Sequence, residues 1–508
     1  MAGLGALQTL ALTHTWAWPL PWLAAAVLVA RLDRASPGRA ATLGMAFGTG
    51  WLGAAVWWLF ISMHRYGGLP APLAALAVLA LALALSTYLA LAGALYARLR
   101  RGQPLADATV FASLWLLAEL ARGVLFTGFP WGAAGYTQVD APLAALAPWV
   151  GVYGVGAVLA FGAAWLAGTL APVPRPQSPA ATAPVRRARA ALLGAAPVAC
   201  VLLALQLLPV ASFTRDAGSL DVRLLQTDVA QDQKFRIESL PQVLDWTAEA
   251  LTAGRAALAI GPETVIPLLP AQLEQLAPGY WQALRQRLQA LGRAALVGVP
   301  LGDATQGYTN SVIGLPGEPA YRYDKVHLVP FGEFVPTGFR WFTELMDIPL
   351  GDFARGSPDA ASFAVQGQRV APNICYEDLF GEELARRFRD PARAPTMLAN
   401  VSNIAWFGDT VAVPQHLNIS RMRTLELQRP MLRATNTGAT AVIDHTGHVQ
   451  ALLPPFTRGT LEARAQGRDG LTPFARWAGR WGLAPLAAAA LALLGMAAWR
   501  ARARGGAA

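Results

Sequence analysis

Long apolar runs near both ends of the chain constrain its fold more than any other feature of the sequence. A helix needs about 20 apolar residues to cross the hydrocarbon core of a bilayer. Such runs predict membrane helices over residues 16–31, 41–63, 70–97, 106–126, 144–170, 190–212 and 482–499. A shorter run at 3–12 predicts a short or re-entrant first helix, and not a removed signal peptide, because no clear small-residue cleavage site follows it. We therefore expect an α-helical bundle of about eight membrane helices.

The composition agrees with a membrane protein. Hydrophobic residues make up 54% of the 508 positions and charged residues only 14%, which is unlike an ordinary soluble enzyme of this size. The formal net charge of +10 would favour nucleic-acid binding if the basic residues covered one soluble face, but many of them lie at the ends of apolar runs. We interpret these residues as topological signals and expect no nucleic-acid partner.

Arginines mark every second loop between the apolar runs, and by the positive-inside rule these loops are cytoplasmic. The arginines are Arg31, Arg34, Arg39, Arg98, Arg100, Arg101, Arg175, Arg186, Arg187 and Arg189. The intervening loops, 64–70 and 127–140, carry a single arginine between them and are expected on the opposite side. The sequence thus predicts N-terminal membrane helices over 1–212, an outer domain over 213–480, and a last membrane helix with a basic cytoplasmic tail over 481–508.

Two ionisable residues, Glu119 and Arg122, lie three positions apart on one predicted membrane helix. Charged side chains are costly in a bilayer unless they are paired. One interpretation is an internal ion pair that holds the helical bundle together. The alternative is a contact for a lipid headgroup near the segment 127–131.

Residues 213–480 follow another pattern, because short β-rich stretches alternate with helical ones. This alternation predicts an α/β domain in which helices cover a sheet, but periodicity does not distinguish a Rossmann-like sheet from a sandwich. The expected strands are 220–226, 256–261, 295–299, 311–315, 370–374, 397–401 and 439–443. The expected helices are 238–253, 273–292, 378–388 and 415–428.

Three kinds of reactive group follow predicted strands of this outer domain. Glu263 emerges at the carboxyl end of one strand, the usual place for ligands in open α/β sheets. Lys325 and Glu333 share one loop, and Cys375 lies where a strand gives way to a predicted helix. A carboxylate, an ammonium and a thiol together supply a base, an oxyanion partner and a nucleophile.

The lysine and the cysteine each have an alternative explanation. Of the 41 lysines and arginines, all but Lys234 and Lys325 are arginines, so a retained lysine indicates a need for a compact or titratable cation, unless codon usage is the cause. Cys375 at a helix amino end would have a lowered thiol pKa, although a lone cysteine after a strand is more often a core residue. Cys200 lies inside an apolar run and is expected to be a small buried hydrophobe.

The trio Glu263, Lys325 and Cys375 resembles the Glu-Lys-Cys triad of the nitrilase superfamily. The sequence around these residues, together with one segment of the membrane part, resembles the apolipoprotein N-acyltransferase family. The resemblance extends over nearly the whole chain. The segments that carry this resemblance are 127–132, 262–267, 323–336, 374–377 and 421–430. The resemblance implies a membrane bundle with an inserted nitrilase-like domain, an α-β-β-α sandwich that faces the periplasm from the bacterial inner membrane. It implies no metal and no diffusible cofactor.

The resemblance also implies a reaction. Glu263 would accept the thiol proton, Cys375 would attack a phospholipid ester to form a thioester, and Lys325 would stabilise the oxyanion. The acyl chain would then pass to the α-amino group of the diacylglyceryl cysteine of an apolipoprotein, the last step of lipoprotein maturation. The expected partners are the phospholipid donor, the apolipoprotein acceptor and the membrane, and we expect a monomer.

Further residues match positions around the family's triad. Glu333 would orient Lys325 or share protons with the base, since two carboxylates beside one ammonium are a stable arrangement. Tyr376 and Glu377 are candidates either for packing or for direct catalysis. Asn403 and Trp406 are candidates for substrate binding or gating.

The segment 402–408 departs from the family pattern. The family usually reads Ser-Asn-Asp-Ala-Trp-Phe-Gly there, whereas this chain has Ile404 in place of the aspartate. If that aspartate holds the loop over the thiol, its loss reduces activity, which keeps open a catalytically impaired homologue that only binds lipoproteins.

A membrane acyltransferase also needs a path for the lipid to its thiol. The largely apolar segment 339–350 contains Trp341 and Phe342, and Tyr280 and Trp281 add aromatic side chains elsewhere. One hypothesis is that these residues dip into the outer leaflet and gate acyl entry, and the alternative is packing in a satellite core. A second enzyme class, a membrane-tethered nitrilase-type amidohydrolase, would use the same triad and transfer its acyl group to water.

Overall fold

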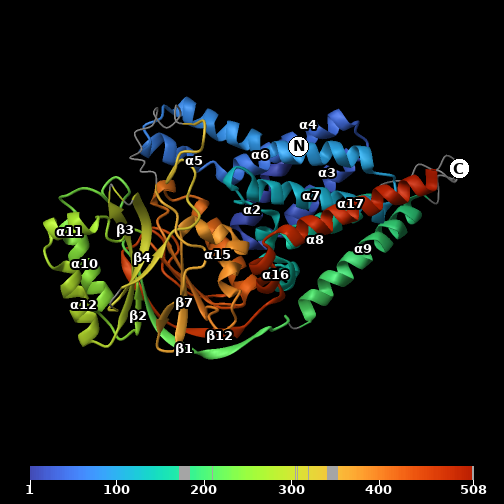
Figure 1. Ribbon diagram of the computed structural model, residues 1–508. Coiled ribbons are helices and arrows are strands. Elements are labelled where there is room, and N and C mark those ends of the chain that lie inside the picture. The colour runs from blue at the N-terminus through green and yellow to red at the C-terminus, as the bar shows by residue number, and fades with distance from the viewer. Residues whose placement is uncertain are drawn as a thin grey trace. The chain divides into compact units, whose positions relative to one another are not determined.

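The computed structural model describes residues 1–170, 183–208, 210–303, 305, 307–317, 320–339 and 353–505. These residues form two compact units (Figure 1). The helical unit comprises Met1–Trp57, Leu76–Ala211 and Trp481–Ala508. The sheet unit comprises Trp58–Ala75 and Ser212–Arg480, so a short N-terminal segment packs with the α/β domain.

The helical unit is built from the apolar runs, and each predicted run is helical in the structure. Its helices are α1 (Ala2–Ala6), α2 (Gln8–Thr13), α3 (Pro19–Leu32), α4 (Pro37–Val56), α6 (Ala71–Leu99), α7 (Pro104–Val124), α8 (Ala147–Leu170), α9 (Ala183–Leu207) and α17 (Ala484–Gly505). Within the described ranges, three helices are long and apolar enough to cross a membrane, or up to five if each of two bent pairs is one span. These helices make the chain a membrane protein.

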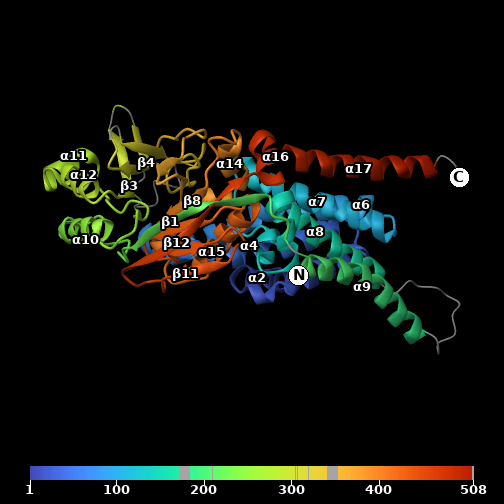
Figure 2. The same cartoon turned by 90° about the horizontal axis from the view of Figure 1, so that it is seen from below.

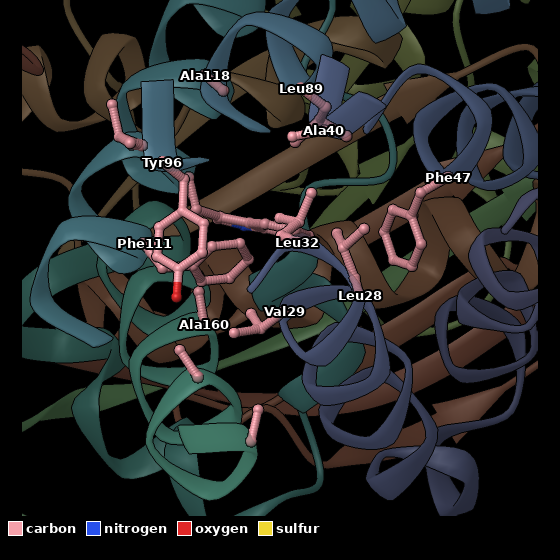
Figure 3. Close-up of a cluster of buried hydrophobic side chains, with 14 of the residues drawn as sticks. Leu28, Val29, Leu32, Ala40, Phe47, Leu89, Tyr96, Phe111, Ala118 and Ala160 are labelled. Atoms are coloured by element: carbon pink, nitrogen blue, oxygen red, sulfur yellow. The ribbon is translucent and has the colours of Figure 1, made fainter. Parts of the chain in front are cut away.

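Aromatic and aliphatic side chains form the core of the helical unit. Figure 3 shows this cluster, in which Phe47 and Phe111 lie among leucine, valine and alanine side chains from several helices. Trp51 and Trp115 stack with ring centroids 5.4 Å apart, and both are fully buried. Large rings at the centre let these helices bury a wide apolar area within the bundle.

Glu119 and Arg122 form an internal ion pair in this unit, with Arg122 Nη2 3.5 Å from Glu119 Oε1. The same glutamate oxygen accepts a hydrogen bond from the backbone N–H of Ala134 at 2.8 Å. Arg122 donates to the carbonyl oxygens of Phe129 and Trp131 at 2.7 and 2.9 Å. The pair is buried and fastens the loop after α7, which supports the internal ion pair over the headgroup contact.

Two six-stranded sheets form the centre of the sheet unit, with strand orders β12-β1-β2-β3-β4-β5 and β11-β10-β9-β8-β7-β6. The first contains β1 (Thr214–Gln226), β2 (Leu258–Ile260), β3 (Ala294–Asp303), β4 (Gly307–Leu315), β5 (Tyr321–Asp324) and β12 (Gly459–Gly470). The second contains β6 (Phe363–Val365), β7 (Gln368–Ile374), β8 (Met397–Ser402), β9 (Met431–Thr435), β10 (Ala441–Ile443) and β11 (Val449–Leu452). Strands β1, β2 and β3 are mutually parallel, as are β7, β8 and β9.

Helices cover the outer faces of both sheets, so the domain has the four layers that the α-β-β-α expectation describes. One buried cluster joins the sheets face to face, with Leu224 and Ile260 from the first and Ile374 and Met397 from the second. Helices α10 (Leu240–Thr252), α11 (Pro270–Leu276) and α12 (Tyr280–Ala290) pack on the first sheet (Figure 1). Helices α14 (Gly381–Ala385), α15 (Ala412–Leu427) and α16 (Pro473–Trp481) lie on the side of the second. Figure 2 shows the long strands β1 and β12 side by side.

Two predicted helices differ from the observed ones. The pattern at 273–292 is divided into α11 and α12, because Gly279 between them adopts a left-handed φ of 73°. The pattern at 378–388 is not one helix but the 3-10 turn η7 (Cys375–Leu379), the short α14, and a second 3-10 turn, η8 (Arg386–Phe388). All seven predicted strands are present, while the short strands β5, β6, β9 and β11 and the long edge strand β12 were not predicted.

Candidate active site

The structure brings the predicted triad together between the two sheets. Glu263 follows β2, Lys325 follows β5, and Cys375 follows β7. Lys325 Nζ lies 3.4 Å from Glu263 Oε1. Both side chains are close enough to the thiol of Cys375 to shift its pKa in opposite directions. The carboxyl ends of strands from both sheets therefore supply the carboxylate, the ammonium and the thiol of the predicted triad.

Glu333 is the nearer partner of Lys325, with Glu333 Oε1 2.9 Å from Lys325 Nζ. Asn310 on β4 joins the two carboxylates, because its amide nitrogen donates to Glu263 Oε1 at 2.7 Å and to Glu333 Oε1 at 2.8 Å. The second oxygen of Glu333 accepts from the backbone N–H of Val329 at 2.8 Å. These contacts agree with the first of the two roles expected for Glu333, to orient Lys325, whereas Asn310 was not predicted.

Lys325 keeps its proton in this arrangement. Burial alone would lower the pKa of its ammonium, since only 1% of the residue is exposed. The negative charges of Glu333 and Glu263 outweigh that effect, and the net result is a pKa above the ordinary value. Lys325 is therefore a fixed positive charge that suits the stabilisation of an oxyanion and not proton transfer.

Cys375 has a strained backbone that two side chains hold in place. Its φ of 53° lies in the left-handed region, which costs a non-glycine residue about 1–2 kcal/mol. The carbonyl oxygen of Cys375 accepts hydrogen bonds from Asn400 Nδ2 at 3.2 Å and from His416 Nε2 at 3.3 Å. Strained residues of this kind persist where the surrounding structure over-determines them, as in the turn that presents a nucleophile.

The expected lowering of the Cys375 thiol pKa is wrong. Burial raises the pKa of this thiol and the charge of Glu263 raises it further, whereas Lys325 and the backbone N–H of Asn403 act in the opposite direction without cancelling the rise. The turn after Cys375 is a five-residue 3-10 helix and not the predicted longer helix. The thiol is therefore protonated at rest, and a base must remove its proton before it can attack.

Glu263 is the candidate for that base, because its charge acts on the Cys375 thiol. Its Oε2 accepts from the backbone N–H of Asn403 at 2.8 Å, while its Oε1 faces Asn310 and Lys325. The side chain of Asn403 is engaged elsewhere, with Gln231 at 2.9 Å and with Asn436 at 2.9 Å. Asn403 thus reaches the site through its backbone.

Glu377 connects the loop of Lys325 with the turn of Cys375. Its Oε1 accepts from the backbone N–H groups of Val326 at 2.6 Å and His327 at 3.1 Å. Its Oε2 accepts from the backbone N–H of Ile374 at 2.6 Å and from the Tyr323 hydroxyl at 2.8 Å. With both oxygens engaged in hydrogen bonds, Glu377 joins the two loops, which favours a structural role over the alternative of direct catalysis.

Tyr376 is buried in an aromatic group beside the site. Its ring lies 5.7 Å from that of His327 and 5.3 Å from that of Phe380. Trp406 lies on the 3-10 turn η9 (Ala405–Phe407), and its ring meets that of Tyr66 edge-on at 5.6 Å. These contacts support packing for both residues.

Ile404 now has a physical explanation. Its side chain is 1% exposed and packs with Val413 and Ala439 in an apolar cluster that also touches Cys375 and Phe407. In these surroundings an isoleucine fills space beside the nucleophile without the desolvation cost of a carboxylate. The triad is assembled with Ile404 present.

Lys234 is a site residue that was not predicted. It lies between β1 and α10, is 5% exposed, and donates from Nζ to the backbone carbonyl of Glu263 at 3.0 Å. Burial lowers the pKa of its ammonium to about 8, although the charges of Glu263 and Cys375 oppose the change. The scarcity of lysine, which pointed to Lys325, applied equally to Lys234.

Some predicted site residues receive no support here. Trp341 and Phe342 lie outside the described residues, and their gating role stays a prediction. Tyr280 and Trp281 pack against the cluster under α10 and α12, and the Tyr280 hydroxyl donates to the carbonyl of Leu244 at 2.9 Å, which supports core packing. Cys200, predicted to be buried, is exposed on α9, because the outer surface of an apolar membrane helix faces lipid.

Metal-binding side chains do not gather at this site. Among the residues that the structure describes, no three His, Cys, Asp or Glu side chains form a group that could hold a metal ion.

Comparisons with known proteins give a consistent result. The chain matches the apolipoprotein N-acyltransferase N-terminal domain over residues 4–165 and the carbon-nitrogen hydrolase family over 224–469. It is 50% identical to the apolipoprotein N-acyltransferase of Verminephrobacter eiseniae, over 95% of this chain and 92% of that protein. It is 48% identical to that of Ralstonia nicotianae, over 98% and 93%. The carbon-nitrogen hydrolase match confirms the nitrilase-like domain expected from the sequence.

Solved structures align with about half of the chain. The NitFhit protein of C. elegans aligns with a TM-score of 0.38 and 17% identity, over 50% of this chain and 62% of that one. An amidase from Nesterenkonia aligns with a TM-score of 0.35 and 17% identity, over 52% and 95%.

Proposed function

Because the chain belongs to the apolipoprotein N-acyltransferase family, we propose that it transfers an acyl chain from a phospholipid to the α-amino group of an apolipoprotein's diacylglyceryl cysteine. One observation supports the chemistry above all: a buried, protonated thiol lies beside a carboxylate and a fixed ammonium. A carboxylate next to a thiol is the arrangement that nucleophilic catalysis requires.

In the first half-reaction, Glu263 takes the proton from Cys375 Sγ and the thiolate attacks the ester carbonyl carbon of the phospholipid. The negative charge that forms on the carbonyl oxygen is stabilised by the Lys325 ammonium. The tetrahedral intermediate collapses with cleavage of the bond to the lysophospholipid oxygen, which takes the proton held by Glu263. A thioester on Cys375 remains.

In the second half-reaction, the neutral amine of the apolipoprotein attacks the thioester carbonyl carbon. Glu263 accepts a proton from the attacking nitrogen, and Lys325 again stabilises the oxyanion. The carbon–sulfur bond then breaks, and the thiolate recovers its proton from Glu263. An amide is formed and the site returns to its starting state, which gives ping-pong kinetics.

The setting of the reaction follows from the same proposal. Residues 1–212 and 481–508 span the bacterial inner membrane, with the catalytic domain 213–480 on the periplasmic side and arginine-rich loops in the cytoplasm. The phospholipid donor reaches the site from the membrane, and the enzyme acts as a monomer.

Mass spectrometry of the intact protein purified from membranes tests the thioester directly. We expect an acyl adduct on Cys375 that disappears on addition of an amine peptide, and no adduct in Cys375→Ala. Loss of the adduct in buffer alone, with release of free fatty acid, would instead identify a hydrolase. Full lipoprotein maturation in cells by Cys375→Ala would show that maturation does not need a thioester on Cys375 and would overturn the proposed mechanism.

A further inference from the structure

Both lysines of the chain lie at the same buried site. All other cations among the 41 lysines and arginines are arginines, yet Lys234 and Lys325 approach the same carboxylate residue from different loops. Lys325 contacts the side chain of Glu263, whereas Lys234 contacts its backbone carbonyl. A buried lysine is rare unless its charge is paired, so the second lysine also needs an explanation.

Lys234 adds a positive charge to a buried site that holds more carboxyl groups than other cations. The carboxyl groups are Glu263, Glu333, Glu377 and Asp378, and the other cations are Lys325 and Arg433. The ammonium of Lys234 offsets part of this excess. Transfer of the thiol proton to Glu263 moves a negative charge onto sulfur and leaves the total charge of the site unchanged.

The position of Lys234 lets it act on that sulfur. The negative charge of a Cys375 thiolate raises the pKa of the Lys234 ammonium, so the two charges attract each other. An opposite charge nearby favours the charged form of a thiol. Other charged groups that act on Lys234, Lys325 or Cys375 are Glu263, Glu333, Glu377, Asp378 and Arg433. At neutral pH a buried ammonium with a pKa of about 8 is still mostly charged.

We propose that Lys234 is a positioning residue of the acyl-transfer site, whose ammonium offsets part of the excess of carboxyl groups and so makes the thiolate of Cys375 accessible. Its hydrogen bond to the Glu263 carbonyl holds the proposed base in position beside the thiol. This inference rests on the proposed role of Cys375 as the nucleophile. It separates two functions of the buried cations: Lys325 faces the oxyanion, and Lys234 sets the electrostatic balance behind the base.

The test measures alkylation of Cys375 by iodoacetamide against pH in the full-length protein. Cys200→Ala in the background leaves Cys375 as the single thiol. Lys234→Gln retains a hydrogen-bond donor without the charge, Lys234→Arg retains the charge, and Lys234→Met retains neither. Thermal unfolding of each variant checks that it folds.

If charge is the function, Lys234→Gln and Lys234→Met slow alkylation at each pH about tenfold, which corresponds to a thiol pKa higher by about one unit. Lys234→Arg then keeps a rate near that of the wild type. A wild-type rate in Lys234→Gln would overturn the proposal and leave the hydrogen bond as the only role. Because Gln and Met are compared with each other, the decision stands even if Lys234→Arg does not fold.

The outcome is separable from that of the proposed function. A wild-type protein without an acyl adduct would count against acyl transfer, whatever the alkylation profiles show. A wild-type protein with the adduct, combined with unchanged profiles in the Lys234 variants, would count only against the role of Lys234.

Discussion

The two sheets of the catalytic domain contribute different chemistry to one site. The first sheet supplies charged groups, with Glu263 after β2 and Lys325 after β5. The second supplies Cys375, the proposed nucleophile, after β7 and, after β8, the backbone N–H of Asn403. We call the charged groups of the first sheet the charged half of the site. We call the residues of the second sheet, where the backbone of Cys375 is strained, the geometric half. Separate substitutions can therefore change the charge of the site and its geometry.

A buried polar group holds the geometric half in place. Arg433 Nη2 donates to His416 Nδ1 at 3.2 Å, so the imidazole carries its proton on Nε2. That N–H faces Asp378 Oδ1 at 3.1 Å and the carbonyl of Cys375 at 3.3 Å. Ser420 and Arg433 also donate to the second oxygen of Asp378. The orientation of the His416 imidazole is thereby fixed by its partners.

Removal of the fixed charge should have the largest effect. Lys325→Met removes the cation that contacts both Glu263 and Glu333, and with it the proposed partner of the oxyanion. We expect kcat for transfer from phospholipid to an amine peptide to fall by about 10³-fold. The control Glu274→Gln changes an acidic residue on α11, away from the site. A decrease in kcat of less than tenfold in Lys325→Met would contradict the assignment of oxyanion stabilisation to Lys325.

Loss of His416 tests the geometric half without removing a charge. His416→Leu deprives the Cys375 carbonyl of one of its two side-chain donors, and release of strain of about 1–2 kcal/mol corresponds to roughly tenfold in kcat. His416→Gln, whose amide nitrogen can replace Nε2–H, should restore most of the activity. Equal losses in both variants would show that the imidazole acts only by filling space.

How much of this site could be predicted from the sequence depends on the range of the interactions. The apolar runs are local patterns, and the helices predicted from them are present. The loop around Lys325 is also a local pattern, and the structure places Lys325 beside Glu263 and Glu333. Asn310 and His416 act through hydrogen bonds to residues far away in the chain, which no local pattern contains. The raised thiol pKa of Cys375 arises from burial between layers, which outweighs the local helix-end effect used for the prediction.

A similar limit applies to the fold. The long helices and the seven predicted strands have clear periods, whereas β6 and β9 are short strands that gain their stability from neighbours in the sheet. The membership of Trp58–Ala75 in the sheet unit was not predicted, because hydrophobicity describes only how apolar a segment is and not what it packs against.

Stability against pH provides a smaller test of the geometric half. Burial alone would raise the pKa of Asp378, but His416, Arg433 and Ser420 outweigh burial and hold the pKa below its ordinary value. A lowered folded-state pKa contributes stability that is complete above the unfolded pKa near 3.9 and is lost as pH falls toward the folded value. We expect Asp378→Asn to lower stability at pH 7 by about 1–3 kcal/mol and to flatten the loss of Tm below about pH 4. If Asp378→Asn showed the same decrease of Tm below about pH 4 as the wild type, the stabilising role assigned to the Asp378 carboxylate would be wrong.

The smallest expected effect concerns a contact that reaches the geometric half from a distant part of the chain. Trp58 lies 4.2 Å from Phe407 between ring centroids, and its indole N–H donates to Gln415 at 3.4 Å. Phe407 belongs to the turn that follows Asn403, whose N–H contacts Glu263. Aromatic pairs contribute about 0.5–1.5 kcal/mol, so Trp58→Ala and Phe407→Ala should each lower kcat about two- to tenfold.

A double-mutant cycle decides whether this aromatic pair acts as one unit. If Trp58 supports the site through Phe407, the double variant should lose no more activity than the more impaired single variant. Trp57→Ala, a neighbouring tryptophan that is more exposed, is the matched control and should leave kcat unchanged. Additive losses would show that Trp58 reaches the site by another path. Coupled losses would mean that the carbon-nitrogen hydrolase region at 224–469 depends on residues 58–66 for its geometry. The geometric half of the site would then need a segment from outside that region, whereas the charged half would not.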